Sequence, residues 1–321
     1  MTTRFAELVG CEQPIQLAGM GPICSDELCA AVSEAGGLGM ITVAATSPEA
    51  LERRLDHIRS LTSKPIGTNF LIPAIDRDCL RIASRTARVV DFFWGDPDSE
   101  LVQIAHSGGA LASWQVGSPA EAVAAERAGC DFIIAQGIEA GGHIRGTLGL
   151  LPLLSQVLDQ VAIPVLAAGG IGSARALSAV LAAGAAGARC GTRFAAARES
   201  AAHPMYVEAL IRAGADDAVR TDLYHVNCPL CPSTHGVLRS AIEAAESIRG
   251  DVLGEVDMGG GNRWSITKFQ GIPAFKAITG RVEAMALYAG QSVGDVHEVQ
   301  PAADILGELV GSPSGKRFAT V

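Results

Sequence analysis

One imidazole lies in a stretch of the sequence that is otherwise built mainly from small residues. His143 follows Gly141 and Gly142 in the segment AQGIEAGGHIRG, which continues directly from the strand-like apolar run DFIIAQG. Two glycines let a chain turn steeply at a strand end, and a neutral imidazole can accept a proton near neutral pH. We therefore predict that His143 is a general base. The alternative is a loop histidine hydrogen-bonded to Glu139 or to the backbone.

Two further glycine-containing segments have the pattern of a phosphate site. The segment VLAAGGIGSARAL places Gly169 and Gly170 at the end of a strand and Ser173 at the start of a helix, and ARCGTRF places Gly191 and Thr192 at the next strand end. Backbone N–H groups at a helix N-terminus bind phosphate. Each glycine pair alone is explained by a tight turn, but on consecutive strands the two pairs together predict one anion site.

Amide side chains follow or end three other strand-like runs. Asn69 lies in GTNFL, Gln115 in ASWQV and Gln136 in IIAQG, while the segment LAGMG adds the soft side chain of Met20. An amide offers both a donor and an acceptor, which suits a planar ring rich in heteroatoms. For any one amide, a hydrogen bond to a neighbouring loop remains the alternative.

The elements that must position these residues are eight short apolar strands separated by helical stretches. The predicted strands cover residues 14–20, 37–43, 65–72, 88–95, 110–117, 131–137, 163–170 and 187–194. Helical segments such as 25–37 and 118–130 open on serine as a plausible N-cap. Eight similar strands in one parallel series predict a closed (β/α)8 TIM barrel, with its functional groups at the strand C-termini. An open dinucleotide-binding sheet is disfavoured because no GxGxxG follows the first strand.

The regular alternation stops after Phe194. We expect residues 1–216 and 274–321 to form the barrel and residues 217–273 to be an inserted lid-like segment, rich in Gly, Cys, Pro and His, before the C-terminal helices. Helical character is expected to return over residues 276–296. The apolar face of AADILGELV, residues 302–310, is either core or a dimer contact, so a homodimer stays open.

A CxxC pair lies inside this insertion. Cys228 and Cys231 are flanked by His225 and His235 in HVNCPLCPSTH, four residues of the types that bind Zn²⁺. Ligands this crowded in sequence rarely close one tetrahedron. We therefore favour a structural loop with incidental thiols, and no metal site is predicted.

Charge and apolar patterning exclude several classes of protein. The formal net charge is −9 with no basic block, which disfavours binding to a nucleic acid or an anionic membrane. The apolar runs are too short to span a bilayer, and the N-terminus lacks a signal-peptide pattern. The eight cysteines are scattered rather than arranged as a disulfide framework. The expectation is a cytoplasmic enzyme acting on a small molecule.

Six segments occur in an order that is similar to one enzyme family. PIQLAGMG, GTNFLIP, QGIEAGGHIRG, PVLAAGGIG, GARCGTRF and YAGQSVG resemble the nitronate monooxygenases, formerly called 2-nitropropane dioxygenases. The resemblance runs from about Pro14 to Phe194 and resumes near Ala284. It implies an FMN-dependent (β/α)8 barrel enzyme that oxidises alkyl nitronates with O2 to a carbonyl compound and nitrite. His143 falls on the family's catalytic histidine, which deprotonates neutral nitroalkanes where these are accepted.

The resemblance also implies most of the cofactor contacts, to which the residue patterns add Gln115 and Gly142. The predicted FMN-binding residues are Ala18, Gly19, Met20, Asn69, Gln115, Gln136, Gly141, Gly142, Gly169, Gly170, Gly191 and Thr192. Two departures stand out: Cys190 replaces a glutamine found in many relatives, and residues 220–238 replace a more basic loop. The second departure leaves the substrate open.

Two other functions remain as alternatives. The FMN-dependent enoyl-acyl carrier protein reductases, which use NAD(P)H, resemble this chain over the same barrel and the same Gly-Gly-His stretch. Such a reductase is expected to carry basic residues around its entrance, whereas this chain is acidic overall. The second alternative is a flavin-binding barrel without turnover, in which His143 is only a loop residue.

Overall fold

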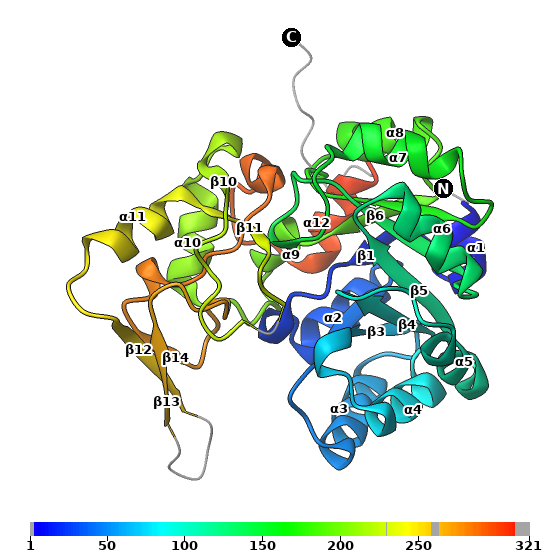
Figure 1. The fold of residues 1–321 in the computed structure, drawn as a ribbon, viewed down its shortest axis with the longest axis horizontal. Helices are drawn as coiled ribbons and strands as arrows, with labels where there is room; N and C mark the ends of the chain where they lie inside the picture. The colour runs from blue at the N-terminus through cyan, green and yellow to red at the C-terminus, as the bar shows by residue number, and fades with distance from the viewer. Residues whose placement is uncertain (1–2, 229, 258–262, 312–321) are drawn as a thin grey trace.

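The protein consists of a barrel and a smaller lobe beside it (Figure 1). The computed structural model describes residues 3–228, 230–257 and 263–311. Within these ranges no helix is long and apolar enough to cross a membrane. Most of the chain up to about residue 200 forms the barrel, and the lobe is built from the segments coloured yellow-green to orange.

The eight predicted strands are all present and form one parallel sheet. Their order around the sheet is β1-β9-β8-β6-β5-β4-β3-β2. A parallel bridge between Gln16 and Leu38 joins the first and last strands of this order, so the sheet closes on itself. The strands are β1 (Ile15–Leu17), β2 (Gly39–Val43), β3 (Ile66–Leu71), β4 (Val89–Phe93), β5 (Leu111–Val116), β6 (Phe132–Gln136), β8 (Val165–Ala168) and β9 (Gly187–Cys190). The predicted TIM-barrel fold is confirmed.

Helices alternate with these strands and cover the outside of the barrel. They are α1 (Arg4–Val9), α2 (Asp26–Glu34), α3 (Pro48–Leu61), α4 (Arg77–Thr86), α5 (Ser99–Gly108), α6 (Pro119–Arg127), α7 (Leu150–Leu158), α8 (Ala174–Ala182), α9 (Thr192–Ala195) and α12 (Ala302–Leu309). Ser25, Ser47 and Ser118 accept a backbone N–H at the starts of α2, α3 and α6. Such caps satisfy N–H groups that lack partners within the helix.

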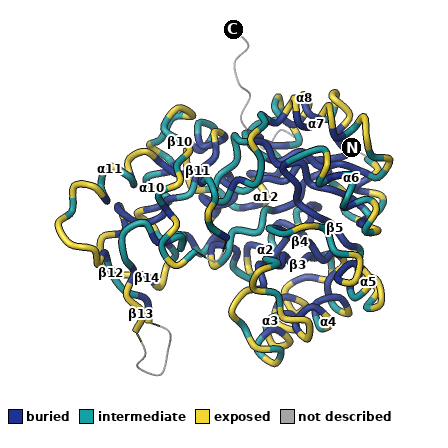
Figure 2. The backbone as a smooth tube through the Cα atoms, in the orientation of Figure 1, coloured by how far each residue is buried: buried dark blue, intermediate teal, exposed yellow. Residues whose placement is uncertain are grey.

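The main hydrophobic core lies between the sheet and its helices, where the strands are buried along most of their length (Figure 2). The rings of Phe92 and Trp114 on neighbouring strands lie 4.9 Å apart. On α12, Ile305 and Leu309 are buried in this same core. The apolar face of that helix is therefore an intrachain contact, which decides between the two readings of residues 302–310.

The smaller lobe has its own sheets and helices. Its helices are α10 (Pro204–Arg212) and α11 (Arg239–Ser247), and its sheets are formed by β7 (Gly142–Ile144), β10 (Ala218–Thr221) and β11 (Thr234–Leu238), and by β12 (Val252–Asp257), β13 (Arg263–Thr267) and β14 (Ile278–Gly280). The order β10-β11-β7 matters because β7 follows barrel strand β6 in the chain. Through β7, a loop of the barrel mouth becomes the edge of a sheet in the lobe.

A second hydrophobic core fills the lobe. It includes Tyr206 and Leu210 of α10, Leu238 of β11 and Met285. These residues come both from within residues 217–273 and from either side of that range. The division into a barrel and a lid at residues 217–273 stays a prediction.

The expected helix over residues 276–296 is wrong. This segment forms β14 and two short 3-10 helices, η4 (Val282–Ala284) and η5 (Gln291–Asp295). Gly280 has φ +115° and Gly290 packs against the backbone of Glu139, so neither position fits a continuous helix. The remaining 3-10 helices are η1 (Gly21–Ile23), η2 (Ile72–Ala74) and η3 (Ala215–Asp217).

Candidate active site

The glycines after β8 adopt conformations that other residues avoid. Gly169 has φ +110° and Gly170 has φ +70°. A Cβ atom on Gly169 would lie 3.1 Å from the backbone N of Ala140. Ser173 is the N-cap of α8 but its side chain accepts no capping hydrogen bond. The turn therefore presents a concave backbone surface next to a helix N-terminus with N–H groups left for an anion.

The end of β9 closes the neighbouring side of this surface. A Cβ on Gly191 would lie 3.2 Å from Cβ of Ala18 and 3.5 Å from Sδ of Met20, so the end of β1 and the end of β9 are in close contact. The Thr192 hydroxyl accepts a hydrogen bond from the backbone N–H of Gly290 at 3.1 Å. The structure thus brings three predicted residues together at the β1–β9 edge and ties Thr192 to the segment before η5.

A layer of polar side chains crosses the barrel interior, and it contains two of the predicted amides. Asp91 and Arg189 are buried, with side chains 0% and 3% exposed, and Nη2 of Arg189 lies 2.8 Å from Oδ2 of Asp91. Asn69 donates to Oδ2 of Asp91 at 2.7 Å, and Ser113 donates to its Oδ1 at 2.8 Å. Arg189 donates through Nη1 to Oε1 of Gln115 at 2.6 Å. The layer is largely satisfied by its own members.

One group in this layer lacks a hydrogen-bond acceptor. Nη2 of Arg189 is close enough to Asp91 for an ion pair, yet its N–H groups make no hydrogen bond within the described residues. A buried donor without an acceptor is costly. A ring carbonyl of a bound cofactor is the kind of acceptor that would satisfy it.

Sequence reasoning missed both members of this ion pair. Asp91 interrupts the apolar run VVDFF, and Arg189 interrupts GARC. Charged residues are almost never fully buried unless they are paired. A charge in the middle of each of two predicted core strands was therefore a usable signal for a buried pair.

Gln136 fixes the loop that carries His143. Its Nε2 donates to the backbone carbonyl of His143 at 2.9 Å, and its Oε1 accepts from the backbone N–H of Arg145 at 3.0 Å. Gly142 turns the chain with φ +68°, and a Cβ on Gly141 would lie 2.7 Å from the backbone N of Gly290. The side-chain amide of Gln136 is thus hydrogen-bonded to the neighbouring loop, and through these bonds it positions β7.

The imidazole of His143 is packed among aromatic rings. Its ring centroid lies 4.3 Å from that of His235, 5.8 Å from that of Trp94 and 6.0 Å from that of Tyr288. Burial, reinforced by the neighbouring His235, lowers the pKa of His143 to about 3. The imidazole is therefore neutral at pH 7 and has a lone pair. Glu139 is engaged elsewhere, because its carboxylate accepts the backbone N–H of Leu150 at the start of α7.

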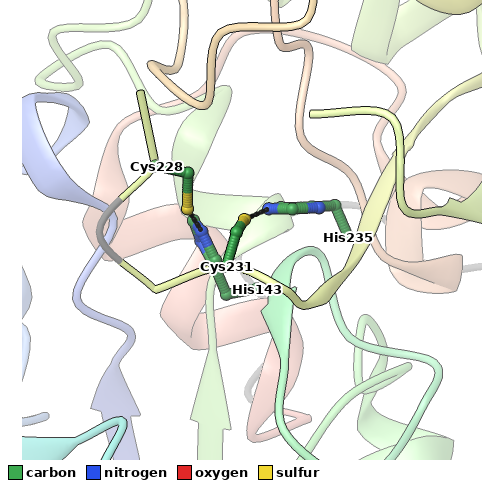
Figure 3. Close-up of side chains that lie close together, drawn as sticks. All are labelled: His143, Cys228, Cys231 and His235. Carbon is green, nitrogen blue, oxygen red and sulfur yellow. Dashed lines mark hydrogen bonds between the residues drawn. The ribbon is translucent and has the colours of Figure 1, made fainter. Parts of the chain in front are cut away.

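Two cysteines and a second histidine complete a cluster around His143 (Figure 3). Nε2 of His143 lies 3.2 Å from Sγ of Cys228, and Sγ of Cys231 lies 3.8 Å from Nε2 of His235. Burial raises the pKa of Cys228 to about 12 and lowers the pKa of His235 to about 4. The sequence grouped His225 with these residues, but its ring Nδ1 lies 3.0 Å from the backbone carbonyl of Asp222.

Arg145, which lies over Trp94 beside this cluster, is paired with carboxylates. The guanidinium of Arg145 lies 5.4 Å from the ring centroid of Trp94, while its Nε donates to Glu121 at 2.8 Å and its Nη2 lies 3.5 Å from Asp96. Trp94 itself has φ +66°, a conformation that non-glycine residues rarely adopt. The barrel mouth thus has an aromatic wall with no free positive charge from Arg145.

Comparisons with known proteins place this chain among flavin-dependent oxidoreductases. A family model for nitronate monooxygenase matches residues 2–79 and 75–312. An indene-carboxyl-CoA dehydrogenase from Rhodococcus jostii is 31% identical over 87% of this chain and 75% of its own length. A probable nitronate monooxygenase from Staphylococcus aureus is 28% identical over 78% of this chain and 82% of its own length.

Solved structures agree with these sequence relatives. FabK from Thermotoga maritima matches with a TM-score of 0.78 and 29% identity, covering 97% of this chain and 96% of its own. A nitroalkane oxidase from Streptomyces ansochromogenes matches with a TM-score of 0.71 and 28% identity, covering 96% of this chain and 97% of its own. From the family model, the shared barrel and the site at its mouth, we conclude that the chain belongs to the nitronate monooxygenase family and is an oxidoreductase of the flavoprotein class.

Proposed function

We propose that the protein binds FMN at the barrel mouth and uses it to oxidise alkyl nitronates with O2 to a carbonyl compound and nitrite. The observation that carries this proposal is the meeting of an anion cradle and a neutral imidazole at the strand C-termini of one barrel. The cradle comprises Gly169, Gly170 and Gly191, and the imidazole is that of His143. Membership of the nitronate monooxygenase family supports the choice of reaction.

The residues present suit FMN in two ways. The glycine turn and the start of α8 would together form one compact anion site, of the kind that a terminal monophosphate requires. Arg175 lies in the first turn of α8, where its positive charge is unfavourable because it opposes the helix dipole. A phosphate bound at this helix end would offset that unfavourable interaction. Buried below the mouth, Nη2 of Arg189 is ion-paired with Asp91 but makes no hydrogen bond within the described residues, so it would be available to donate to a ring carbonyl. Ala18, Gly19, Met20 and the amide of Asn69 complete the proposed ring contacts.

Bound FMN would supply the electron transfer from the substrate to O2. The chain's own contribution is positioning, exclusion of water and proton transfer. A nitronate has already lost its α-proton and needs no base, whereas a neutral nitroalkane must be deprotonated first. His143 is the neutral acceptor for that proton, with Trp94 and Tyr288 packed around its ring. Because burial holds the pKa of His143 to about 3, it is a weak base. Neutral nitroalkanes are therefore expected to react more slowly than nitronates.

Anaerobic mixing tests the proposal directly. The purified protein is expected to be yellow and to release FMN on denaturation, and propyl nitronate is expected to bleach the flavin without O2. His143→Ala should keep FMN and nitronate oxidation but lose activity on neutral nitroethane by about 10²- to 10⁴-fold. His225→Ala is the matched control, because His225 lies in the same loop but faces the backbone carbonyl of Asp222 and is not among the side chains gathered around His143. Equal nitroethane turnover in both variants would place the base elsewhere.

Acyl-thioester oxidoreduction is the second candidate function. Its support is the Rhodococcus jostii relative, which is named as a CoA-thioester dehydrogenase, and the match to FabK. The neutralised charge of Arg145 gives no added attraction for an anionic carrier at the mouth. Bleaching by NADH or NADPH, reversed by crotonyl-CoA and without response to propyl nitronate, would favour this candidate. A yellow protein that responds to neither reductant would indicate a flavin-binding barrel without turnover.

A further inference from the structure

The four side chains of the thiol–imidazole cluster, His143, Cys228, Cys231 and His235, come from two segments that are far apart in sequence. His143 lies on β7, and His235 is its direct partner across the antiparallel β7–β11 ladder. Cys228 and Cys231 lie on the loop that leads into β11. One potential ligand atom from each residue lies within 4.8 Å of all the others. The fold thus gathers four ligand-type atoms at the seam between the barrel mouth and the smaller lobe (Figure 3).

The distances are those of a site for a single ion. In a tetrahedral zinc site with Zn–S of about 2.3 Å and Zn–N of about 2.0–2.1 Å, neighbouring ligand atoms are about 3.3–3.8 Å apart. In this cluster, His143 Nε2 and Cys228 Sγ are 3.2 Å apart, and Cys231 Sγ and His235 Nε2 are 3.8 Å apart. Each cysteine faces one histidine, so small rotations would direct all four atoms to a common centre.

The chemistry of the donors selects among metals. Two thiolates and two imidazoles suit Zn²⁺, whereas Mg²⁺ and Ca²⁺ require oxygen ligands. The thiolates would balance the charge of the ion, so the occupied site would carry no net charge in its buried position. A two-iron cluster with cysteines on one iron and histidines on the other would separate the two pairs. Here every ligand atom lies within 4.8 Å of the rest.

Without an ion, the cluster leaves polar groups poorly satisfied. His235 is fully buried, and its Nδ1 makes no hydrogen bond within the described residues. Burial lowers the pKa of His235, and the backbone of Thr221, which lies across the β10–β11 ladder from it, opposes this shift and is therefore a candidate to orient the ring. Metal-bound histidines almost always use the other ring nitrogen in this way. Thiol–imidazole contacts are weak hydrogen bonds, and they do not account for four such groups meeting at one point.

We propose that His143, Cys228, Cys231 and His235 bind one Zn²⁺ ion, which joins β7 of the barrel mouth to the loop before β11. Sequence spacing alone favoured a purely structural loop, because it supplied three of these residues and placed His225 as the fourth. The structure replaces His225 with His143, which comes from a separate segment. This change removes the objection that four ligands from one short stretch cannot close a tetrahedron.

The bound ion has a consequence for the barrel mouth, and this consequence rests on the proposed function. Coordination through Nε2 would use the lone pair of His143 and remove it as a proton acceptor. The zinc-loaded enzyme would then oxidise nitronates only, and the metal-free enzyme would also accept neutral nitroalkanes. The comparison of His143→Ala with its control on nitroethane is therefore made after zinc has been removed with a chelator. The ratio of nitroethane to propyl nitronate turnover is expected to rise by about 10²- to 10⁴-fold on metal removal.

Metal content tests the site independently of catalysis. We expect elemental analysis of tag-free protein, purified without chelators, to find about one zinc per chain. X-ray absorption at the zinc edge should then show two sulfur and two nitrogen neighbours at about 2.3 and 2.0–2.1 Å. Cys228→Ser and Cys231→Ser should each lose the metal, while His225→Gln, in the same loop, should keep it. Circular dichroism verifies that the serine variants fold. If a variant does not fold, the wild-type protein is tested instead: its thiols should resist a thiol reagent until a chelator is added.

One result would overturn the site. It is a folded wild-type protein that holds no metal and takes up none from a zinc solution while Cys228 and Cys231 are reduced, as mass spectrometry verifies. A zinc-loaded protein without nitronate turnover would contradict the proposed function and leave the metal site standing, so the two proposals fail separately.

Discussion

Two polar clusters lie on either side of the barrel mouth, one buried and one partly buried, and they differ in how their polar groups are satisfied. Inside the barrel, Asp91 and Arg189 form an ion pair, and Asn69, Ser113 and Gln115 hydrogen-bond to it. Between the barrel and the lobe, the members of the thiol–imidazole cluster are joined by thiol–imidazole contacts, and burial lowers the pKa of both imidazoles and raises the pKa of the Cys228 thiol. The barrel cluster is stabilised by the opposite charges of its own residues, whereas the thiol–imidazole cluster would be stabilised by a bound cation.

This difference teaches how to tell structural from ligand-binding polar groups. A buried ion pair that is hydrogen-bonded on most sides is complete without a ligand. A group of strong metal ligands that contains a buried nitrogen without a hydrogen bond is incomplete without a ligand. By the same criterion, the one atom of the ion pair that points to a cofactor is Nη2 of Arg189, which lies beside Asp91 but makes no hydrogen bond within the described residues.

The largest change in the free energy of unfolding is expected when the ion pair inside the barrel is broken. Arg189→Met should reduce the free energy of unfolding by about 3–5 kcal/mol, because it leaves the carboxylate of Asp91 buried without its cation. Arg77→Met is the matched control, since Arg77 pairs with Glu100 at the exposed surface. That change should cost less than about 1 kcal/mol. Urea unfolding measures the free energy of unfolding of both variants. Similar decreases in the two variants would mean that the buried Asp91–Arg189 pair stabilises the protein no more than an exposed pair does.

Metal removal should act on the other cluster and spare the first. If Zn²⁺ binds, a free concentration about 100-fold above its Kd stabilises the folded site by about 2.7 kcal/mol. Chelation should then lower amide-exchange protection in β7 and β11 and leave β4 and β9 unchanged. Hydrogen exchange followed by mass spectrometry measures this. Uniform loss of protection over the whole chain would contradict a site confined to the seam between barrel and lobe.

The smallest effect on stability is expected at the phosphate cradle. Gly169→Ala and Gly109→Ala both place a side chain at positive φ, +110° and +94° respectively. Each should lose about 1 kcal/mol of stability. Only the first adds a Cβ to the proposed cradle, because Gly109 caps α5 in open space. Fluorescence titration should therefore show weaker FMN binding for Gly169→Ala alone. Equal affinities would remove this turn from the flavin site.

The barrel could be predicted from the sequence because its signals are local. Each strand is a short apolar run, most of these runs end near a glycine, and helices such as α2 and α6 begin after a serine that caps them. The segment 276–296 was mistaken for a helix because its apolar spacing resembles one, while the strand pairing of β12 with β14 is decided by contacts distant in sequence.

Taken alone, the sequence determined the closed parallel sheet, the glycine turns at the ends of β8 and β9, and the position of His143 after β6, since periodicity and backbone freedom are properties of neighbouring residues. Tertiary structure alone decided the partners of the buried polar groups. Asp91 meets Arg189, and His143 rather than His225 meets Cys228, because strand order and the β7–β11 pairing bring together residues that the sequence separates. Pairing of this kind depends on distance in space, which no local pattern encodes.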